Sequence, residues 1–264
     1  MDDLTRRLLQ WRITARACRK CTLLSNGTQI NPDDPIQLAH AQIHYETRVR
    51  PRHSRGWATA MLDKRPEAEC QVNVLQASLE SGIIAVLEAP NEDDTYDLDK
   101  GYLTVDQHTD ETGKFTHRLF NHIGVPVERV LFANAVQCLP SHDGTKYRVT
   151  RRQRNNCREH LQSLVTLVQP KAIVAFGNEA VQTLHRFEPF RAEGRALRLA
   201  EVTVGQMIGQ VVPGWWSTNV VPLFHPSPLV RANAFRKDGR PGAGRSEGDQ
   251  LKDIEIVIRV VHSR

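Results

Sequence analysis

The stretch that decides the fold runs from Ile83 to Asp94 and reads Ile-Ile-Ala-Val-Leu-Glu-Ala-Pro-Asn-Glu-Asp-Asp. Its first five residues are apolar, and a carboxylate, a proline and an acidic turn follow at once. A short apolar run bounded by turn residues is typical of a buried strand in a parallel sheet. In open α/β sheets, ligands bind beyond the carboxyl ends of the strands. The sequence therefore predicts a ligand site at the end of this strand, beside Glu88.

Similar patterns recur along the rest of the chain. Three further buried strands are expected, at residues 130–136, 171–176 and 219–224. Helices are expected at about residues 2–16, 115–123, 151–168, 177–187 and 249–261. Thr150 is the expected N-cap of the third helix, and Gly124 is the expected C-cap of the second. Strands that alternate with helices predict an α/β fold, a three-layer αβα arrangement around a central, mostly parallel four-stranded sheet.

We expect residues 1–264 to form a single domain with two additions to this framework. The first is an irregular insertion at about residues 25–80, which contains several Pro and Arg residues. The second is a long acidic loop at about residues 91–113. Loops of this length in a compact domain are usually functional or disordered.

The charge of the chain points to an anionic partner. The formal net charge is +5 and the pI is near 9.1. Arginines gather at residues 6–19, 48–55, 148–154 and 231–245. Such clusters are expected where a protein meets phosphates, although solvated surface is the alternative for any one of them.

No apolar run is long enough to cross a bilayer, and the first residues lack the apolar core of a signal peptide. We therefore expect a cytoplasmic protein with no membrane partner. We also expect it to be a monomer.

The five cysteines are an odd number in a chain without an export signal, which argues against a disulfide framework. Cys18 and Cys21 form one CxxC pair, Cys138 follows a predicted strand, and Cys157 lies on a predicted helix. Four thiolates can bind either zinc or an iron–sulfur cluster, and reduced, buried cysteines are the alternative. Cys70 is left over.

Seven features occur in an order that resembles the uracil-DNA glycosylase superfamily, and most of all its iron–sulfur branch, family 4. They are the N-terminal CxxC, a strand ending Glu88-Ala89-Pro90, Phe115 at the next helix, the segment from Asn134 to Cys138, a helix with Cys157, the strand from Pro170 to Gly177, and the segment from His225 to Leu229. The resemblance covers about residues 1–24 and 82–262.

The resemblance implies a DNA glycosylase that extrudes a base from DNA and hydrolyses its N-glycosidic bond. Glu88 and His225 would be catalytic, Glu88 at the attacking water and the sugar cation, His225 at the departing base. Phe115 would stack on the extruded base, and Asn134 would read its Watson–Crick edge. Ala89, Asn91 and Asp94 would also contact the base, and backbone groups of Ala89 and Pro90 are the alternative to Glu88 for positioning the water.

It also implies a cofactor and a DNA-contacting loop. A [4Fe-4S] cluster would be held by Cys18, Cys21, Cys138 and Cys157, with zinc as the alternative ion. Ser227, Leu229 and Arg231 would contact DNA where the family places its duplex-penetrating loop.

The chain departs from the family pattern around the pocket. Leu87 and Asn91 replace two glycines of the first motif, and Asp94 stands where the family has a glutamate near the 5-position of the pyrimidine. Asp94 is shorter and would leave more room. The preferred base is therefore expected to be uracil or a bulkier modified pyrimidine, removed in base excision repair or in defence against modified viral DNA.

Two other functions stay open on the sequence. One is a non-catalytic DNA-binding module of the same fold, which has lost its chemistry with the motif glycines. The other is a zinc-stabilised α/β hydrolase that acts on nucleotides, with Glu88 and His225 as acid and base.

Overall fold

A computed structural model describes residues 3–16, 78–89, 96–97, 102–103, 111–136, 141–142, 147–214, 218–232 and 244–263. Nearly all of the predicted insertion lies outside these residues. The chain forms two compact units. The first unit comprises residues 1–72, 89–104 and 134–167, and the second comprises residues 73–88, 105–133 and 168–264.

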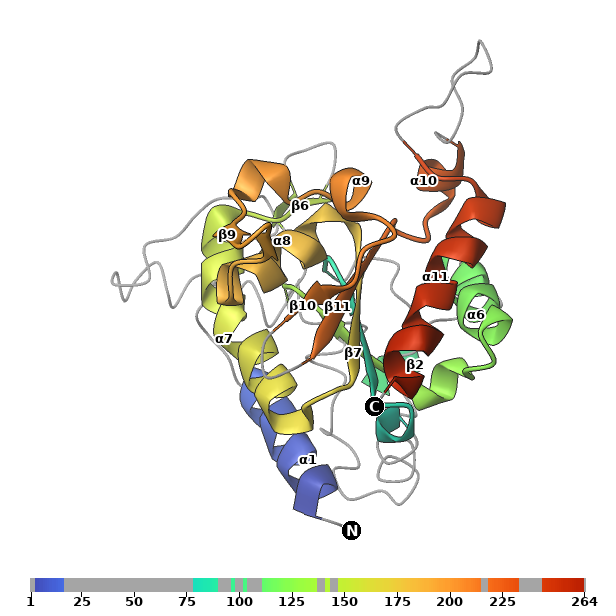
Figure 1. The fold of residues 1–264 in the computed structure, drawn as a ribbon. Coiled ribbons are helices and arrows are strands. Elements are labelled where there is room, and N and C mark those ends of the chain that lie inside the picture. Colours follow the sequence, from blue (N-terminus) through green and yellow to red (C-terminus); the bar gives the residue numbers. More distant parts are fainter. Residues whose placement is uncertain are drawn as a thin grey trace. The chain divides into compact units, whose positions relative to one another are not determined.

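A five-stranded sheet forms the centre of the second unit (Figure 1). Its strands, in spatial order, are β10 (Val212–Pro213), β11 (Asn219–Leu223), β7 (Ala172–Phe176), β1 (Ile83–Leu87) and β4 (Leu131–Asn134). β7 pairs in parallel with β1 on one side and with β11 on the other. The predicted α/β class and the mostly parallel sheet are confirmed.

The prediction of four strands is wrong by one, because β10 pairs antiparallel with β11 at the edge of the sheet. β10 is only two residues long, Val212 and Pro213, so it carries no periodic signal that a sequence pattern could reveal. The four predicted strands are all present, each within two residues of its expected bounds.

Helices cover both faces of this sheet, as the three-layer prediction requires. Figure 1 shows α8 (Gly177–Phe187) and α9 (Val204–Met207) on one side and α6 (Glu111–His122) and α11 (Glu247–His262) on the other. The ring of Phe120 on α6 meets Phe132 and Phe176 edge to face, with centroids 5.9 and 6.3 Å apart. These contacts fix α6 on the sheet through β4 and β7.

Several short elements connect these helices and strands. They are the 3₁₀ turns η2 (Val127–Arg129) and η3 (Leu199–Glu201), the hairpin β8 (Arg191–Ala192) with β9 (Arg195–Ala196), and α10 (Pro228–Ala232). None of them was predicted, since each is shorter than two helical turns or a typical strand.

The acidic loop was predicted at residues 91–113. Its predicted end is wrong, because α6 begins at Glu111. Phe115 therefore lies on the second turn of α6 and not at its start. Gly124 ends the helix as expected, with φ of 70° and a bond from its N–H to the Asn121 carbonyl. Within the loop, β2 (Tyr96–Asp97) pairs with β3 (Tyr102–Leu103).

The first unit contains α1 (Asp3–Arg16), α7 (Arg151–Val168) and the short pair β5 (Ser141–His142) and β6 (Tyr147–Arg148). α7 begins at a capping box, because the Gln153 N–H donates to Thr150 Oγ1 and the Thr150 N–H donates to Gln153 Oε1. The predicted cap at Thr150 is therefore confirmed. The indole of Trp11 on α1 donates to the His160 carbonyl of α7 at 2.9 Å, which joins the two helices.

Among the described helices, none combines the length and the apolar character needed to cross a bilayer.

Candidate active site

Three residues of the second unit lie just beyond the carboxyl ends of parallel strands, at the same end of the sheet. Glu88 comes directly after β1, Gly177 directly after β7, and His225 shortly after β11. Ala85, Val174 and Val221 are level across the three strands. Adjacent strands lie about 4.8 Å apart, so the backbones that lead to Glu88 and His225 are separated by about 10 Å. β7, which ends next to Gly177, lies between them.

The exposures of these side chains differ. Glu88 is exposed and His225 is half-buried. A carboxylate such as that of Glu88 has the oxygen acceptors that a general base needs. His225 can present an imidazole N–H to a group at the same edge.

Gly177 shapes the space beside His225. Its φ is +84°, and a Cβ at this position would lie 3.6 Å from the His225 Cβ. A glycine is needed for this turn, because L-residues rarely adopt positive φ. The turn starts α8 directly at the strand end, with the backbone close to His225. The sequence analysis identified the strand before Gly177 but not the glycine itself. The role of Gly177 is visible only in its positive φ.

Phe115 and Arg231 form a second feature of this unit. The Phe115 side chain is fully buried on α6. The guanidinium carbon of Arg231, on α10, lies 4.4 Å from the centre of its ring. Arg118, one turn further along α6, lies 5.3 Å from the same centre. Two arginines thus contact the ring that the resemblance assigns to base stacking.

Arg231 is fixed in this position by the segment that precedes its helix. Its Nη1 donates to the Pro226 carbonyl at 2.6 Å. Ser227 caps α10, because its Oγ accepts the Val230 N–H at 3.4 Å. Ser227 and Arg231 are both half-buried. The segment predicted as a DNA-contacting loop is therefore a capped helical turn that holds Arg231 against Phe115.

Glu111 offsets part of the positive charge around Phe115. Lys114, whose Nζ lies 2.6 Å from Glu111 Oε1, lowers the pKa of this carboxyl, and the charges of Arg231 and Arg118 lower it further. Arg118 also donates to Glu247 of α11 at 3.1 Å. At neutral pH these groups leave a net positive charge beside the aromatic ring.

Two predicted site residues belong to the first unit. Asn134 ends β4 and its side chain is buried, with 3% of its surface exposed. Ala89 packs against a cluster formed by Val136, Val149 and Cys157. Cys157 is reduced and buried in this apolar cluster.

The cluster lies next to the segment that leads to Cys138, since Val136 is two residues before it. The Trp11 bond to α7 likewise brings in α1, which ends shortly before Cys18. In the described part of the chain, no three His, Cys, Asp or Glu side chains gather as metal ligands. Cys18, Cys21 and Cys138 lie outside that part, as do Asn91 and Asp94, and so does the side chain of Leu229.

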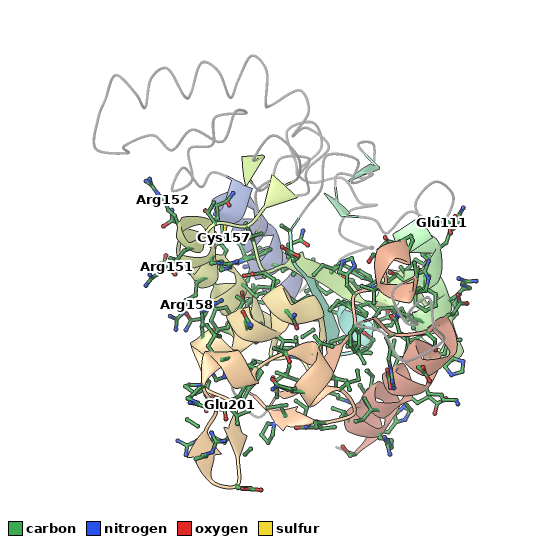
Figure 2. All side chains as sticks on the ribbon, turned by 90° about the horizontal axis from the view of Figure 1, so that it is seen from above. Glu111, Arg151, Arg152, Cys157, Arg158 and Glu201 are labelled. Carbon is green, nitrogen blue, oxygen red and sulfur yellow. The ribbon has the colours of Figure 1, made fainter. Side chains whose placement is uncertain are left out.

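The arginines of α7 form an exposed basic surface. Figure 2 shows Arg151, Arg152 and Arg158 pointing outward from α7, while Cys157 lies on the inner side. Arg151 and Arg158 are exposed and are seven residues apart, so they share one helix face. Arg151 and Arg152 belong to the arginine cluster at 148–154, whose expected role in phosphate binding stays a prediction.

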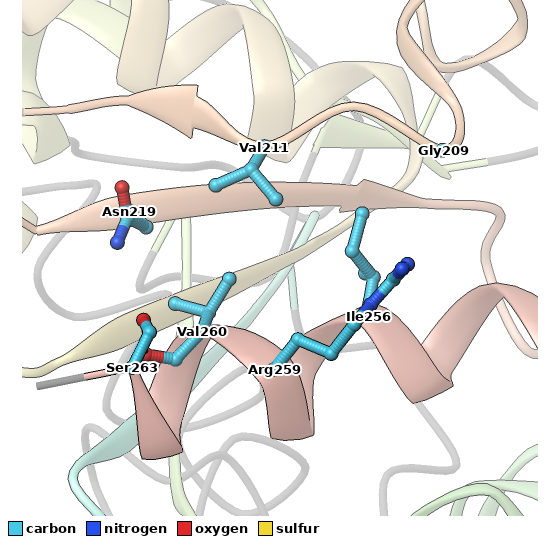
Figure 3. Close-up of a pocket in the computed structure, with 7 residues that line it drawn as sticks. All are labelled: Gly209, Val211, Asn219, Ile256, Arg259, Val260 and Ser263. Atoms are coloured by element: carbon cyan, nitrogen blue, oxygen red, sulfur yellow. The ribbon is translucent and has the colours of Figure 1, made fainter.

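An open pocket of about 460 Å³ lies at the other end of the strands, beside the start of β11 (Figure 3). Its lining residues come from β11, from α11 and from the segment before β10. They are Gly209, Val211, Asn219, Ile256, Arg259, Val260 and Ser263. Asn219 begins β11, whereas His225 follows its end, so the two lie roughly 20 Å apart. The pocket is therefore separate from the edge that carries Glu88 and His225.

Known proteins share sequence features with this chain. A family model described as the uracil DNA glycosylase superfamily matches residues 78–240. A type-4 uracil-DNA glycosylase of Thermotoga maritima is 26% identical over 168 residues, which are 63% of this chain and 76% of the relative. The residues matched by the family model include Glu88, Phe115, Asn134 and His225.

Proposed function

Because the chain belongs to the uracil-DNA glycosylase superfamily and is a DNA glycosylase, we propose that it releases uracil or another modified pyrimidine from DNA and leaves an abasic site. The observation that carries the proposal is the shared edge of the sheet, where Glu88 follows β1 and His225 follows β11. The strands that lead to these two residues lie about 10 Å apart with β7 between them, so a sugar and base bound beyond the strand ends would lie between the two groups.

The target base must leave the duplex before these groups can reach it, because its glycosidic bond is inaccessible in the stack. The net positive charge on Arg118, Arg231 and their neighbours favours the approach of DNA phosphates. The resemblance assigns the stacking of the unstacked base to Phe115, although its side chain is fully buried in this structure. Asn134 offers both an amide donor and a carbonyl acceptor, which matches the imide edge of uracil.

The proposed hydrolysis breaks the bond between C1′ of the sugar and N1 of the base. The bonding electrons leave with the base, and an N–H of His225 stabilises the anion that forms. Glu88 stabilises the positive charge that develops on the sugar and accepts a proton from the attacking water. The water oxygen bonds to C1′, and the base anion then takes a proton from solvent.

The identity of the base depends on residues near its 5-position. Leu87 is half-buried at the end of β1, where the family pattern has glycine. Asp94 stands where the pattern has the longer glutamate. A pocket with a shorter carboxylate there admits a larger 5-substituent, so we propose that 5-modified pyrimidines are substrates beside uracil. A role in repair follows if uracil is preferred, and a role in defence follows if a viral modification is preferred.

The substrate test uses oligonucleotides with a single uracil, hydroxymethyluracil, hydroxymethylcytosine or glucosylated cytosine. Alkaline cleavage after incubation reveals abasic sites. We expect cleavage of at least one oligonucleotide, in single- or double-stranded form. Absence of an abasic product from all of them would contradict the proposed function.

We also propose that Cys18, Cys21, Cys138 and Cys157 hold a [4Fe-4S] cluster. Cys157 fits this role, because it is buried among Val136, Val149 and Ala89, where a thiolate needs a compensating cation. The Trp11 bond to the His160 carbonyl brings α1 to α7, so the chain segments before Cys18 and around Cys157 are already joined. When bound, the cluster would supply a covalent link between three segments of the first unit.

The visible spectrum of anaerobically purified protein tests this proposal. A cluster absorbs broadly near about 400 nm, whereas zinc is silent there. Cys157→Ser should reduce this absorbance, and Cys70→Ser, outside the proposed ligand set, should leave it unchanged. A colourless protein with stoichiometric zinc would support the alternative ion. We also propose that the protein is a cytoplasmic monomer, whichever of the two metal groups it binds.

A further inference from the structure

The short helix α10 needs contacts from outside itself to keep its place. It has five residues, and an isolated helix shorter than about 12 residues is marginal in water. Its last carbonyl groups have no partner within the helix. One of them, the carbonyl of Val230, accepts the N–H of Arg245 at 3.2 Å. Arg245 lies just before α11, beside whose start Figure 1 shows α10.

Arg245 is itself held by its side chain. Its Nε and Nη2 each donate to a carboxylate oxygen of Asp253 on α11, both at 2.8 Å. Two parallel charge-assisted bonds fix the distance and the orientation of the guanidinium together. The Asp253 side chain is only 10% exposed and that of Arg245 is 34% exposed. Water and salt therefore screen this pair less than they screen an ordinary surface pair.

Gln250 holds the backbone of the same arginine. Its Nε2 donates to the Arg245 carbonyl at 3.0 Å. The Gln250 side chain is only 3% exposed, and its Oε1 has no hydrogen-bond partner among the described residues. A buried acceptor without a partner lowers the stability of a fold. An apolar side chain would avoid this loss, so stability alone does not account for a glutamine at this position.

We propose that Arg245, Asp253 and Gln250 form a clasp that positions α10 for contact with DNA. All three are positioning residues, because they act through the backbone of α10 and not on the sugar or the base. This inference rests on the proposed function, in which the segment from Ser227 to Arg231 contacts DNA. It adds the start of α11 to the elements that determine DNA affinity.

The clasp should affect DNA affinity and leave bond cleavage unchanged. Without it, only a fraction of the molecules would hold α10 in place, and the apparent affinity for DNA would fall by that fraction. Once DNA is bound, its own contacts keep α10 in place. The rate of base release at saturating DNA is then unchanged, so the KM for DNA rises while kcat does not fall.

The test compares Asp253→Asn with the matched control Glu255→Gln. Steady-state kinetics are measured on the oligonucleotide that the wild type cleaves best. Each substitution removes one negative charge from α11 and preserves the size of the side chain. Glu255 faces His122 of α6, with 2.9 Å between its Oε1 and the His122 Nε2. Loss of a negative charge by itself favours DNA binding, so a weaker affinity in Asp253→Asn cannot be a charge effect.

We expect the KM for DNA to rise by about 3- to 30-fold in Asp253→Asn, with kcat within about twofold of the wild type. In Glu255→Gln the KM should be unchanged or lower. Arg245→Lys should lie between the wild type and Asp253→Asn, because an ammonium keeps the charge but not the two parallel bonds. Gln250→Met should also raise the KM, with little change in the urea midpoint, because it removes the unpaired oxygen together with the bond.

Amide hydrogen exchange of the free protein gives a readout that does not depend on catalysis. The amides of Val230 and Arg231 should exchange faster in Asp253→Asn and in Gln250→Met than in the wild type, because α10 opens more often without the clasp. Glu255→Gln should exchange at the wild-type rate.

An unchanged KM in both Asp253→Asn and Gln250→Met overturns the inference. A fall of kcat at constant KM, an equal rise of KM in Glu255→Gln, or unchanged exchange of the α10 amides also overturns it. The proposed function fails separately, if the wild type releases no base from any oligonucleotide. Fluorescence anisotropy then measures the dissociation constant for DNA in place of KM, and the same comparison of variants decides the inference.

Discussion

Glu88 is the residue on which the proposed hydrolysis depends most directly. It follows the buried strand β1 at the edge that also carries His225. Its side chain is exposed to solvent.

Glu88→Gln should lower the single-turnover rate of base release by about 10²- to 10⁴-fold, because the amide can neither take a proton from water nor balance the sugar cation. DNA affinity should change little. Glu80→Gln is the control, since Glu80 is exposed before the other end of β1 and pairs with Arg129 at 3.3 Å. Rates within threefold of the wild type would remove Glu88 from the mechanism.

Gly177 is the residue whose backbone most constrains the site. Gly177→Ala should destabilise the fold by about 1–2 kcal/mol, because its φ of +84° is strained for alanine. The added Cβ would meet His225 at an ordinary distance of 3.6 Å, so backbone strain and not steric overlap is the cause.

Urea unfolding followed by circular dichroism measures this difference. Gly205→Ala on α9 is the control, because nothing lies within 4 Å of its added Cβ and no positive φ is involved. It should be neutral or stabilise by up to about 1 kcal/mol. Equal effects of the two substitutions would show that the turn at Gly177 is not strained.

At the scale of elements, α7 combines two functions on two faces. Its inner face buries Gln153, Cys157, Leu161 and Leu164, which follow one another at helical spacing. Its outer face presents Arg151 and Arg158 (Figure 2). The first turn carries no acidic residue, although a helix N-terminus favours one. Arg151 thus stands in a first turn where its charge does not help the helix.

The double substitution Arg151→Gln and Arg158→Gln should weaken binding to duplex DNA and make the slope of log K against log salt shallower by about 1–2. Fluorescence anisotropy at several salt concentrations measures both quantities. The matched control replaces Arg191 and Arg259, which are exposed on β8 and α11. An unchanged slope in the α7 variant, or the same loss in the control, would contradict a specific role for this surface.

For the whole molecule, His185 links stability to pH. Its side chain on α8 is 6% exposed, its Nδ1 accepts the Phe190 N–H at 3.0 Å, and its ring meets Phe190 at 5.3 Å between centroids. Burial lowers the pKa of His185 below its usual 6.5, and the charge of Arg186 lowers it further. The unfolded chain therefore takes up this proton at a higher pH than the folded protein does.

Stability should fall as the pH decreases below 6.5 and should level off at the folded pKa, with a loss of up to about 1.4 kcal/mol per pH unit in that window. Above 6.5 the group is neutral in both states and contributes no slope. Urea unfolding of the wild type and of His185→Gln at pH 7.5 and 5.5 isolates this contribution. A loss of stability in the variant as large as in the wild type would assign the slope to other groups.

The sequence by itself determined the framework of this protein. Continuous apolar runs located the buried strands, and the cap at Thr150 located the start of α7, because these signals act within a few residues of one another. Gly124 ended α6 for the same reason. The order of motifs around Glu88 and His225 was enough to indicate the family.

Only the tertiary structure decided what those local signals leave open. β10 exists because it pairs with β11, and two residues have no strand pattern of their own. Arg231 lies over Phe115 although more than a hundred residues separate them, because α10 and α6 meet in the fold. Such contacts depend on sheet register and on the packing of helices, which involve distant residues and leave no periodic trace in the sequence. The strand that ends at Glu88 was therefore predictable, whereas the contact of Arg231 with the ring of Phe115 was not.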